Sequence, residues 1–148
     1  SALRPGGQLM FIVWRTIDDN PWLGLGKQVV LDYLQSPGDD ARTCGPGPFS
    51  MANPETVKKQ LEIAGYEDIN FRCIDGPVTI GADIDNAVRF QLNLGPAGEI
   101  FREAGEEAER RREDIEHAMR KAFTPYLTDN GVVMPSSSWT ITARRPFD

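Results

Sequence analysis

The sequence is poor in the residues from which metal and redox sites are built. It has one histidine, His117, and two cysteines, Cys44 and Cys73, which lie far apart and match no Cys-x-x-Cys spacing. With a single histidine, we do not expect a zinc site made of cysteine and histidine ligands. We expect both cysteines to be reduced thiols of a cytoplasmic protein.

Long apolar runs and an excess of basic residues are also missing. The longest apolar run, Leu9–Trp14, has the length of a strand and falls far short of the roughly 20 residues of a membrane helix. Acidic residues outnumber basic ones by 22 to 16, for a net charge of −6. The chain therefore lacks the basic surface that gives nucleic-acid binding most of its affinity. We expect no signal peptide, no membrane and no nucleic acid as a partner.

What is present is the composition of one globular domain, with 148 residues, 40% hydrophobic and 26% charged. Leu9–Trp14 is continuously apolar, which is typical of a strand buried on both faces of a parallel sheet. Apolar and polar residues alternate in two later segments, which predicts strands over 69–73 and 138–143. A parallel strand of the first kind needs parallel neighbours that these segments do not supply. We therefore expect residues 1–148 to be a truncated domain.

Helices are predicted between these strands. Asn20 before Pro21, and Asn53 before Pro54, are a capping residue followed by a first-turn proline. Apolar spacing predicts a short helix over 83–94 and a longer, continuous one from about 99 to 126. Strands that alternate with helices indicate an α/β fold.

The order of motifs resembles the class I S-adenosylmethionine-dependent methyltransferases. Leu3-Arg4-Pro5-Gly6-Gly7-Gln8-Leu9 is similar to the LxPGGxL segment that enters the fifth strand of that family. Val13-Trp14-Arg15 followed by Asn20-Pro21-Trp22 resembles the VWR…NPW stretch of a bacterial subgroup of the ubiquinone/menaquinone-biosynthesis type. Gly47-Pro48-Phe49, then Pro54 and the helix ending at Gly65-Tyr66, are similar to the segment leading into the sixth strand. Ser138–Arg145 resembles the terminal seventh strand.

This resemblance implies the C-terminal part of a Rossmann-like, seven-stranded methyltransferase sheet, with strands 5, 6 and 7 joined by helical insertions. In the family the sheet is mostly parallel and its last strand is antiparallel. The cofactor site of the family needs a glycine-rich turn after the first strand and an acidic residue at the end of the second. Neither is present here, since Gly24-Leu25-Gly26 lies within a predicted helix. We therefore expect the N-terminal, cofactor-binding half to be absent, and no S-adenosylmethionine to bind this chain.

The substrate side of the site is expected where the fifth strand ends, because ligands of doubly wound sheets bind at the carboxyl ends of strands. Trp14 and Trp22 are interpreted as pocket walls, or alternatively as core residues. Arg15 is a candidate anchor for a polar or anionic acceptor, and Phe49 either lines the same mouth or holds its loop to the core. We assign no catalytic residue and no metal ligand, and we interpret the lone histidine as a boundary residue of its helix.

These expectations define two alternative functions. In the first, the chain is a fragment of a bacterial methyltransferase that acts on a small organic acceptor and is inactive alone, with S-adenosylmethionine bound only by the full-length parent. Removal of half a sheet would expose the Leu9–Trp14 strand, so we expect a homodimer or a swapped oligomer. In the second, the chain is a stand-alone, non-enzymatic α/β module that binds an apolar ligand or a protein partner.

Overall fold

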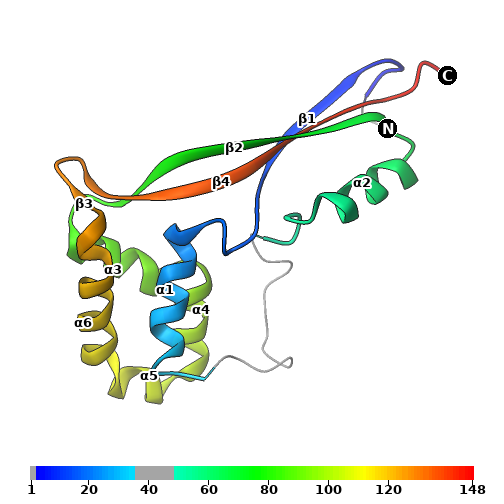
Figure 1. Cartoon of the computed structure of the whole chain (residues 1–148). Coiled ribbons are helices and arrows are strands. Elements are labelled where there is room, and N and C mark those ends of the chain that lie inside the picture. The colour runs from blue at the N-terminus through cyan, green and yellow to red at the C-terminus, as the bar shows by residue number, and fades with distance from the viewer. Residues whose placement is uncertain (1–2, 36–48) are drawn as a thin grey trace. The chain divides into compact units, whose positions relative to one another are not determined.

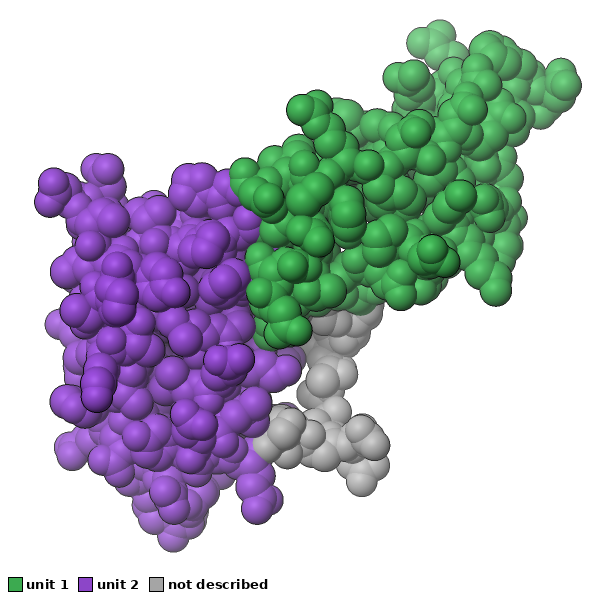
Figure 2. All heavy atoms as spheres, in the orientation of Figure 1, with its two compact units in different colours: residues 1–19, 45–75, 137–148 green, residues 20–44, 76–136 purple. Residues whose placement is uncertain are grey.

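The computed structural model describes residues 3–35 and 49–148. These residues form two compact units, coloured green and purple in Figure 2, and each unit is described by itself. Unit 1 comprises residues 1–19, 45–75 and 137–148, and unit 2 comprises residues 20–44 and 76–136. Two long strands, β2 (Glu67–Gly81) and β4 (Gly131–Arg144), contribute residues to both units.

Unit 1 is built on three strands and one helix. β1 (Gln8–Trp14) pairs with β4, and β4 lies between β1 and β2 in the sheet (Figure 1). β1 and β4 are antiparallel, with Gln8 opposite Arg144 and Trp14 opposite Ser138. The sheet is antiparallel throughout, so β1 and β2 run in the same direction on either side of β4. This confirms a mixed α/β fold.

The helix of unit 1, α2 (Pro54–Ile63), begins as its sequence predicts. The Asn53 side chain accepts hydrogen bonds from the backbone N–H groups of Glu55 and Thr56, at 3.0 and 3.5 Å. Just before the helix, the carbonyl of Ala52 accepts a 3.1 Å hydrogen bond from Nε1 of Trp139, on β4. The chain that leads into α2 is therefore attached to one face of the sheet.

The prediction that β1 is buried on both faces is wrong for the residues the structure describes. Phe11 lies opposite the fully buried Ile141, on the face that carries Trp139. On the other face, Met10 and Ile12 are 68% and 63% exposed. Side chains of a strand alternate between the two faces, and the neighbour of β1 is antiparallel β4. An antiparallel sheet can leave one face open to water, which a parallel sheet rarely does.

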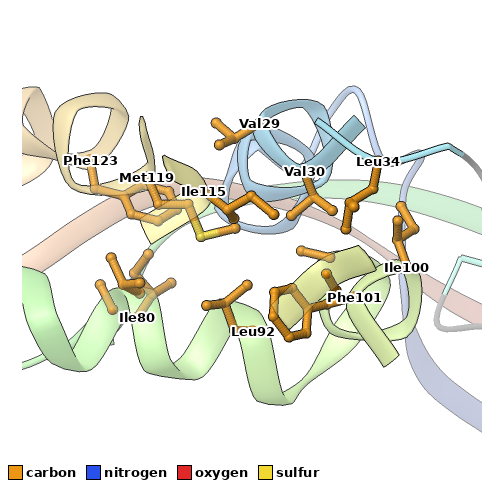
Figure 3. Packing of buried hydrophobic residues seen from close by; sticks show 14 of the residues in the cluster. Val29, Val30, Leu34, Ile80, Leu92, Ile100, Phe101, Ile115, Met119 and Phe123 are labelled. Carbon is orange, nitrogen blue, oxygen red and sulfur yellow. The ribbon is translucent and has the colours of Figure 1, made fainter. Parts of the chain in front are cut away.

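Unit 2 is a helical cluster. It contains α1 (Pro21–Leu31), α3 (Ile84–Asn93), α4 (Gly95–Ala104), α5 (Glu106–Arg110), α6 (Arg112–Phe123) and the short 3-10 helix η1 (Thr124–Tyr126). α1 and α3 each pack against both α4 and α6. Figure 3 shows the apolar core that these helices share with β2 and β4, which includes Val30, Leu92, Phe101, Ile115, Met119, Phe123 and Val132.

Gly26, within α1, has a packing role. Gly26 is buried, and a Cβ added to it would lie 2.3 Å from Oε1 of Gln91, on α3. Gln91 is itself fully buried, and its Nε2 donates a 2.6 Å hydrogen bond to the carbonyl of Trp22. The absence of a side chain at Gly26 therefore makes room for a polar contact between two helices.

The single long helix predicted from 99 to 126 is wrong, because the segment is broken twice. Gly105 has a φ of +57° and separates α4 from α5. Arg111, at φ −102° and ψ 5°, separates α5 from α6. The apolar stripe of the sequence continues across both breaks, since Phe101, Ala108 and Ile115 are all buried.

β4 and β2 are much longer than their predicted segments, 138–143 and 69–73. Proline inside β4, at Pro135, argues against a strand in the sequence. The hydrogen bonds from the Arg15 N–H to the Ser137 carbonyl and from the Arg145 N–H to the Gly7 carbonyl show that odd-numbered residues of β4 face β1. The register with β1 ends at Ser138, so the missing N–H of Pro135 costs no bond to that strand. The short β3 (Leu127–Thr128), which pairs with the start of β4, is not predicted either.

Among the described residues, no helix combines the length and the hydrophobicity that a membrane span requires.

Candidate functional site

Arg15 lies immediately after β1 and is held in register with β4. Its backbone N–H donates a 3.0 Å hydrogen bond to the carbonyl of Ser137. The guanidinium carbon lies 4.9 Å from the centre of the Trp139 ring, a cation–π distance. On its other side, Nη2 lies 3.6 Å from Oδ2 of Asp19. Arg15, the predicted anchor residue, is therefore held in place by contacts within unit 1.

Two side chains link Arg15 to a second carboxylate, Asp75. Arg15 Nη1 donates to Ser137 Oγ at 3.0 Å and to Cys73 Sγ at 3.3 Å. Ser137 Oγ in turn donates to Asp75 Oδ1, and the Cys73 thiol lies 3.5 Å from the same oxygen. A hydroxyl and a thiol thus bridge a cation and an anion. We call these residues, with Asp19 and Trp139, the Arg15 cluster.

The electrostatics of the cluster favour an ionised Asp75. The hydrogen bond from Ser137 lowers the pKa of this carboxyl below its ordinary value of 3.8, and the Cys73 thiol and the Arg15 charge lower it further. Ser137 is buried, whereas Asp75 and Cys73 are exposed. The cluster therefore exposes a hydrogen-bond-accepting carboxylate and a thiol to solvent, and the buried Ser137 hydroxyl lies beside both.

An arrangement of this kind can bind and orient a polar small molecule. An ionised carboxylate accepts hydrogen bonds from hydroxyl or amine groups. A carboxyl with a lowered pKa is a weak base near neutral pH, so Asp75 is better suited to orienting a ligand than to removing its proton. The Trp139 ring beneath Arg15 supplies an apolar surface beside these polar groups.

The structure does not bring all four predicted site residues together. Trp14 precedes Arg15 and lies opposite Ser138, so it belongs to the face that carries Met10 and Ile12. Phe49 lies in unit 1 and is partly buried, and its carbonyl accepts a 3.2 Å hydrogen bond from the N–H of Ala52.

Trp22 belongs to unit 2 and has the contacts of a residue at the edge of the core. Its Nε1 donates a 3.0 Å hydrogen bond to Oδ1 of the fully buried Asn20, and its ring stacks on Phe90 at 6.4 Å. Asn20 stands at the N-cap of α1, but its side chain makes no capping hydrogen bond. The alternative interpretation of this tryptophan, as a core residue, agrees with these contacts.

Sequence reasoning overlooked the residues that complete the Arg15 cluster. Asp75 lies just after the predicted strand 69–73, so the rule that selected Arg15 at the end of a strand could also have selected it. Ser137 could not be found in this way, because it precedes the predicted last strand. Its place beside Arg15 follows only from the register between β1 and β4.

Unit 2 contains a separate open cavity of about 480 Å³. Leu92 and Phe101 form its apolar part, and the Arg112 guanidinium lies 4.7 Å from the centre of the Phe101 ring. Hydrogen bonds from Arg112 to Glu109, at 2.8 and 2.9 Å, raise the pKa of this arginine, so it stays cationic. Among the residues the structure describes, no group of three or more histidine, cysteine or acidic side chains could hold a metal ion.

A scan against known protein families finds no family that matches this chain, and a search of curated proteins finds no significant match.

Proposed function

We propose that this chain is the acceptor-side part of a class I S-adenosylmethionine-dependent methyltransferase, and that the Arg15 cluster forms part of the pocket for a small organic acceptor. The observation that carries the proposal is the position of the cluster, where β1 ends and beside β2, which runs in the same direction. In doubly wound sheets, ligands bind at the carboxyl ends of strands that run in the same direction. As part of the same proposal, the parent enzyme is bacterial and cytoplasmic.

The order of the strands also supports the proposal. The segment that resembles the terminal strand of the family is β4, and it is antiparallel to both β1 and β2. The resemblance to the methyltransferases implies one antiparallel strand, the last, in an otherwise parallel sheet. The antiparallel direction of β4, which is a feature of the backbone, thus agrees with the order of the sequence motifs.

Within the proposed pocket the residues of this chain bind and orient the acceptor. Methyl transfer from a sulfonium is a direct displacement that depends on alignment of the reacting atoms. Asp75 accepts a hydrogen bond from a hydroxyl or amine of the acceptor. The Ser137 hydrogen bond, and to a smaller extent the Cys73 thiol and the Arg15 charge, lower the pKa of this carboxyl, and the Trp139 ring contacts the apolar part of the acceptor.

The described residues do not fit the cofactor itself. No glycine-rich turn follows a strand among them in the way that S-adenosylmethionine binding requires, and the space beside Gly26 in α1 is occupied by Gln91. We therefore derive no step that involves the cofactor. In the proposed parent enzyme, sequence outside this chain supplies that site.

The proposal is tested by NMR titration of the 148-residue chain with small phenols, catechols and aromatic amines. We expect ligands of this class to shift the Trp139 indole and Ser137 amide signals, and the shifts to disappear in Arg15→Ala. Arg89→Ala is the matched control, because Arg89 is an exposed arginine of unit 2 that donates a 3.5 Å hydrogen bond to Asn86. Shifts confined to unit 2, or equal shifts in both variants, would contradict the acceptor pocket.

The cofactor is tested separately, by calorimetry with S-adenosylmethionine and by mass spectrometry for a methylated product. We expect neither binding nor product from this chain alone. Cofactor binding would overturn the division of the parent enzyme into two parts, yet it would leave the acceptor pocket intact.

The cavity of unit 2 favours a second candidate function, in which the chain is a binding module for a small ligand. Its apolar residues, Leu92 and Phe101, lie beside the permanently charged Arg112. Glu106 and Glu109 also line the cavity, and Glu109 already pairs with Arg112, so the site suits a mainly apolar molecule with a neutral polar group. Ligand-induced shifts of Phe101 that persist in Arg15→Ala and are lost in Phe101→Ala would support this function.

A further inference from the structure

β1 is an edge strand of the sheet in the part of the chain that the structure describes. It pairs with β4 on one side, and no other described strand lies next to it. The hydrogen bonds at Arg15 and Gly7 assign the odd-numbered residues of β1 to the ladder with β4. By alternation, the backbone N–H and C=O groups of Met10 and Ile12 point away from β4, toward the open edge.

The side chains of the same two residues are exposed as well. Met10 is 68% and Ile12 63% exposed, and both lie on the face away from Trp139. The strand Gln8–Trp14 contains no charged residue and no proline. Edge strands that must remain single usually carry a charge, a proline or a bulge that blocks further pairing. β1 has neither of the first two protections.

We propose that β1 pairs with β1 of a second copy of this chain, antiparallel and centred on Phe11. A twofold axis through Phe11 places Met10 opposite the partner's Ile12, and Ile12 opposite the partner's Met10. The four exposed apolar side chains then form one cluster on the open face. No charged residue of the strand meets another across the axis, because the strand has none.

The hydrogen-bond pattern of β1 fits this register. Met10 and Ile12 direct their backbone groups outward, so each forms a hydrogen-bonded pair with the residue opposite it. Phe11 directs its own groups to β4, and it therefore meets the partner's Phe11 in a non-hydrogen-bonded pair, where Cα atoms approach most closely. A centre on Met10 would instead place Ile12 opposite the partner's Gln8, and a centre on Ile12 would place Met10 opposite the partner's Trp14, so only the centre on Phe11 pairs the two exposed apolar residues with each other. This strand pair concerns residues 1–148 by themselves, because further strands of the proposed parent enzyme would lie along the same edge of β1.

Sedimentation equilibrium of the 148-residue chain tests the proposal at concentrations up to about 100 μM, since an interface of one strand pair is small. We expect a dimer for the unchanged chain. Ile12→Lys should raise the dissociation constant more than about tenfold, because it places a charge on the pairing edge. Ile63→Lys is the matched control, since Ile63 is 78% exposed on α2. A monomer for the unchanged chain overturns the proposal, as does a dimer that Ile12→Lys leaves intact.

Disulfide trapping tests the register itself, in chains whose native Cys44 and Cys73 are replaced by serine. Phe11→Cys should cross-link two copies under mild oxidation, because the paired Cα atoms lie within disulfide range. Leu9→Cys, on the same face of the same strand, should not, because its opposite residue is the partner's Val13. Equal cross-linking by both variants, or by Leu9→Cys alone, overturns the register centred on Phe11.

Discussion

Replacement of Gly131 by alanine is expected to destabilise unit 2 strongly. Gly131 begins β4 after the hairpin loop, and its φ is +103°. A Cβ added there would lie 2.4 Å from the carbonyl oxygen of Gly81 and 3.2 Å from Cα of Ala82. These are backbone atoms at the end of β2, so a change of side-chain rotamer cannot relieve the contact.

The magnitude of this effect has two parts. A residue other than glycine at positive φ costs about 1–3 kcal/mol, and overpacking in a closely packed region costs about 1–3 kcal/mol more. We therefore expect the free energy of unfolding to fall by about 2–6 kcal/mol. Gly105→Ala isolates the first part, because Gly105 has a φ of +57° and nothing lies within 4 Å of an added Cβ. We expect it to cost about 1–3 kcal/mol.

Gly76→Ala in β2 is the control without either cost. Gly76 is not among the glycines with positive φ, and an added Cβ would meet nothing within 4 Å. We expect a change within about 0.5 kcal/mol. Urea unfolding monitored by far-UV circular dichroism measures all three variants, because every described helix except α2 belongs to unit 2. The reasoning is refuted if Gly131→Ala costs no more than Gly105→Ala, or if Gly76→Ala costs as much as either.

Three further substitutions test other contacts. Ser137→Ala should raise the pKa of Asp75, because the Ser137 hydrogen bond is the main cause of the lowered pKa. NMR titration measures this pKa, and an unchanged value would refute the prediction. Because that pKa is lowered on folding, the stability it contributes is present above about pH 3.8 and is lost as the pH falls, so the stability difference between variant and wild type should shrink in acid. Asn53→Ala should cost about 1 kcal/mol by removing the cap of α2, and amide exchange in the first turn would report it. Gly26→Ala should displace Gln91 and cost about 1–3 kcal/mol, whereas in a double-mutant cycle Gln91→Ala should remove most of that cost.

The helix starts can be predicted from the sequence because their signals are local. Asn53 and Pro54 mark the start of α2 without reference to any other part of the chain. The break at Gly105 has a visible signal too, a glycine, but the apolar stripe that continues past it favours one long helix. What the stripe could not show is that Gly105 adopts a positive φ.

Strand ends and exposure depend on pairing between distant segments, which no local pattern reports. Met10 and Ile12 read as core residues in a continuous apolar run, and their exposure follows from the antiparallel register of β1 with β4. The same register brings Ser137 to Arg15. The sequence thus identifies Arg15, and the same strand-end rule could have identified Asp75, whereas Ser137 requires the sheet.

The register between β1 and β4 also has a consequence for synthesis on the ribosome. Gln8 pairs with Arg144, so β1 is translated well before the strand that it pairs with. The consecutive helices α3 to α6 have mostly local neighbours and can fold as they emerge. During that interval the uncharged β1 is open to pairing with β1 of neighbouring nascent chains. Translation rate and chaperone access, more than the stability of the finished fold, would then set the yield of native protein.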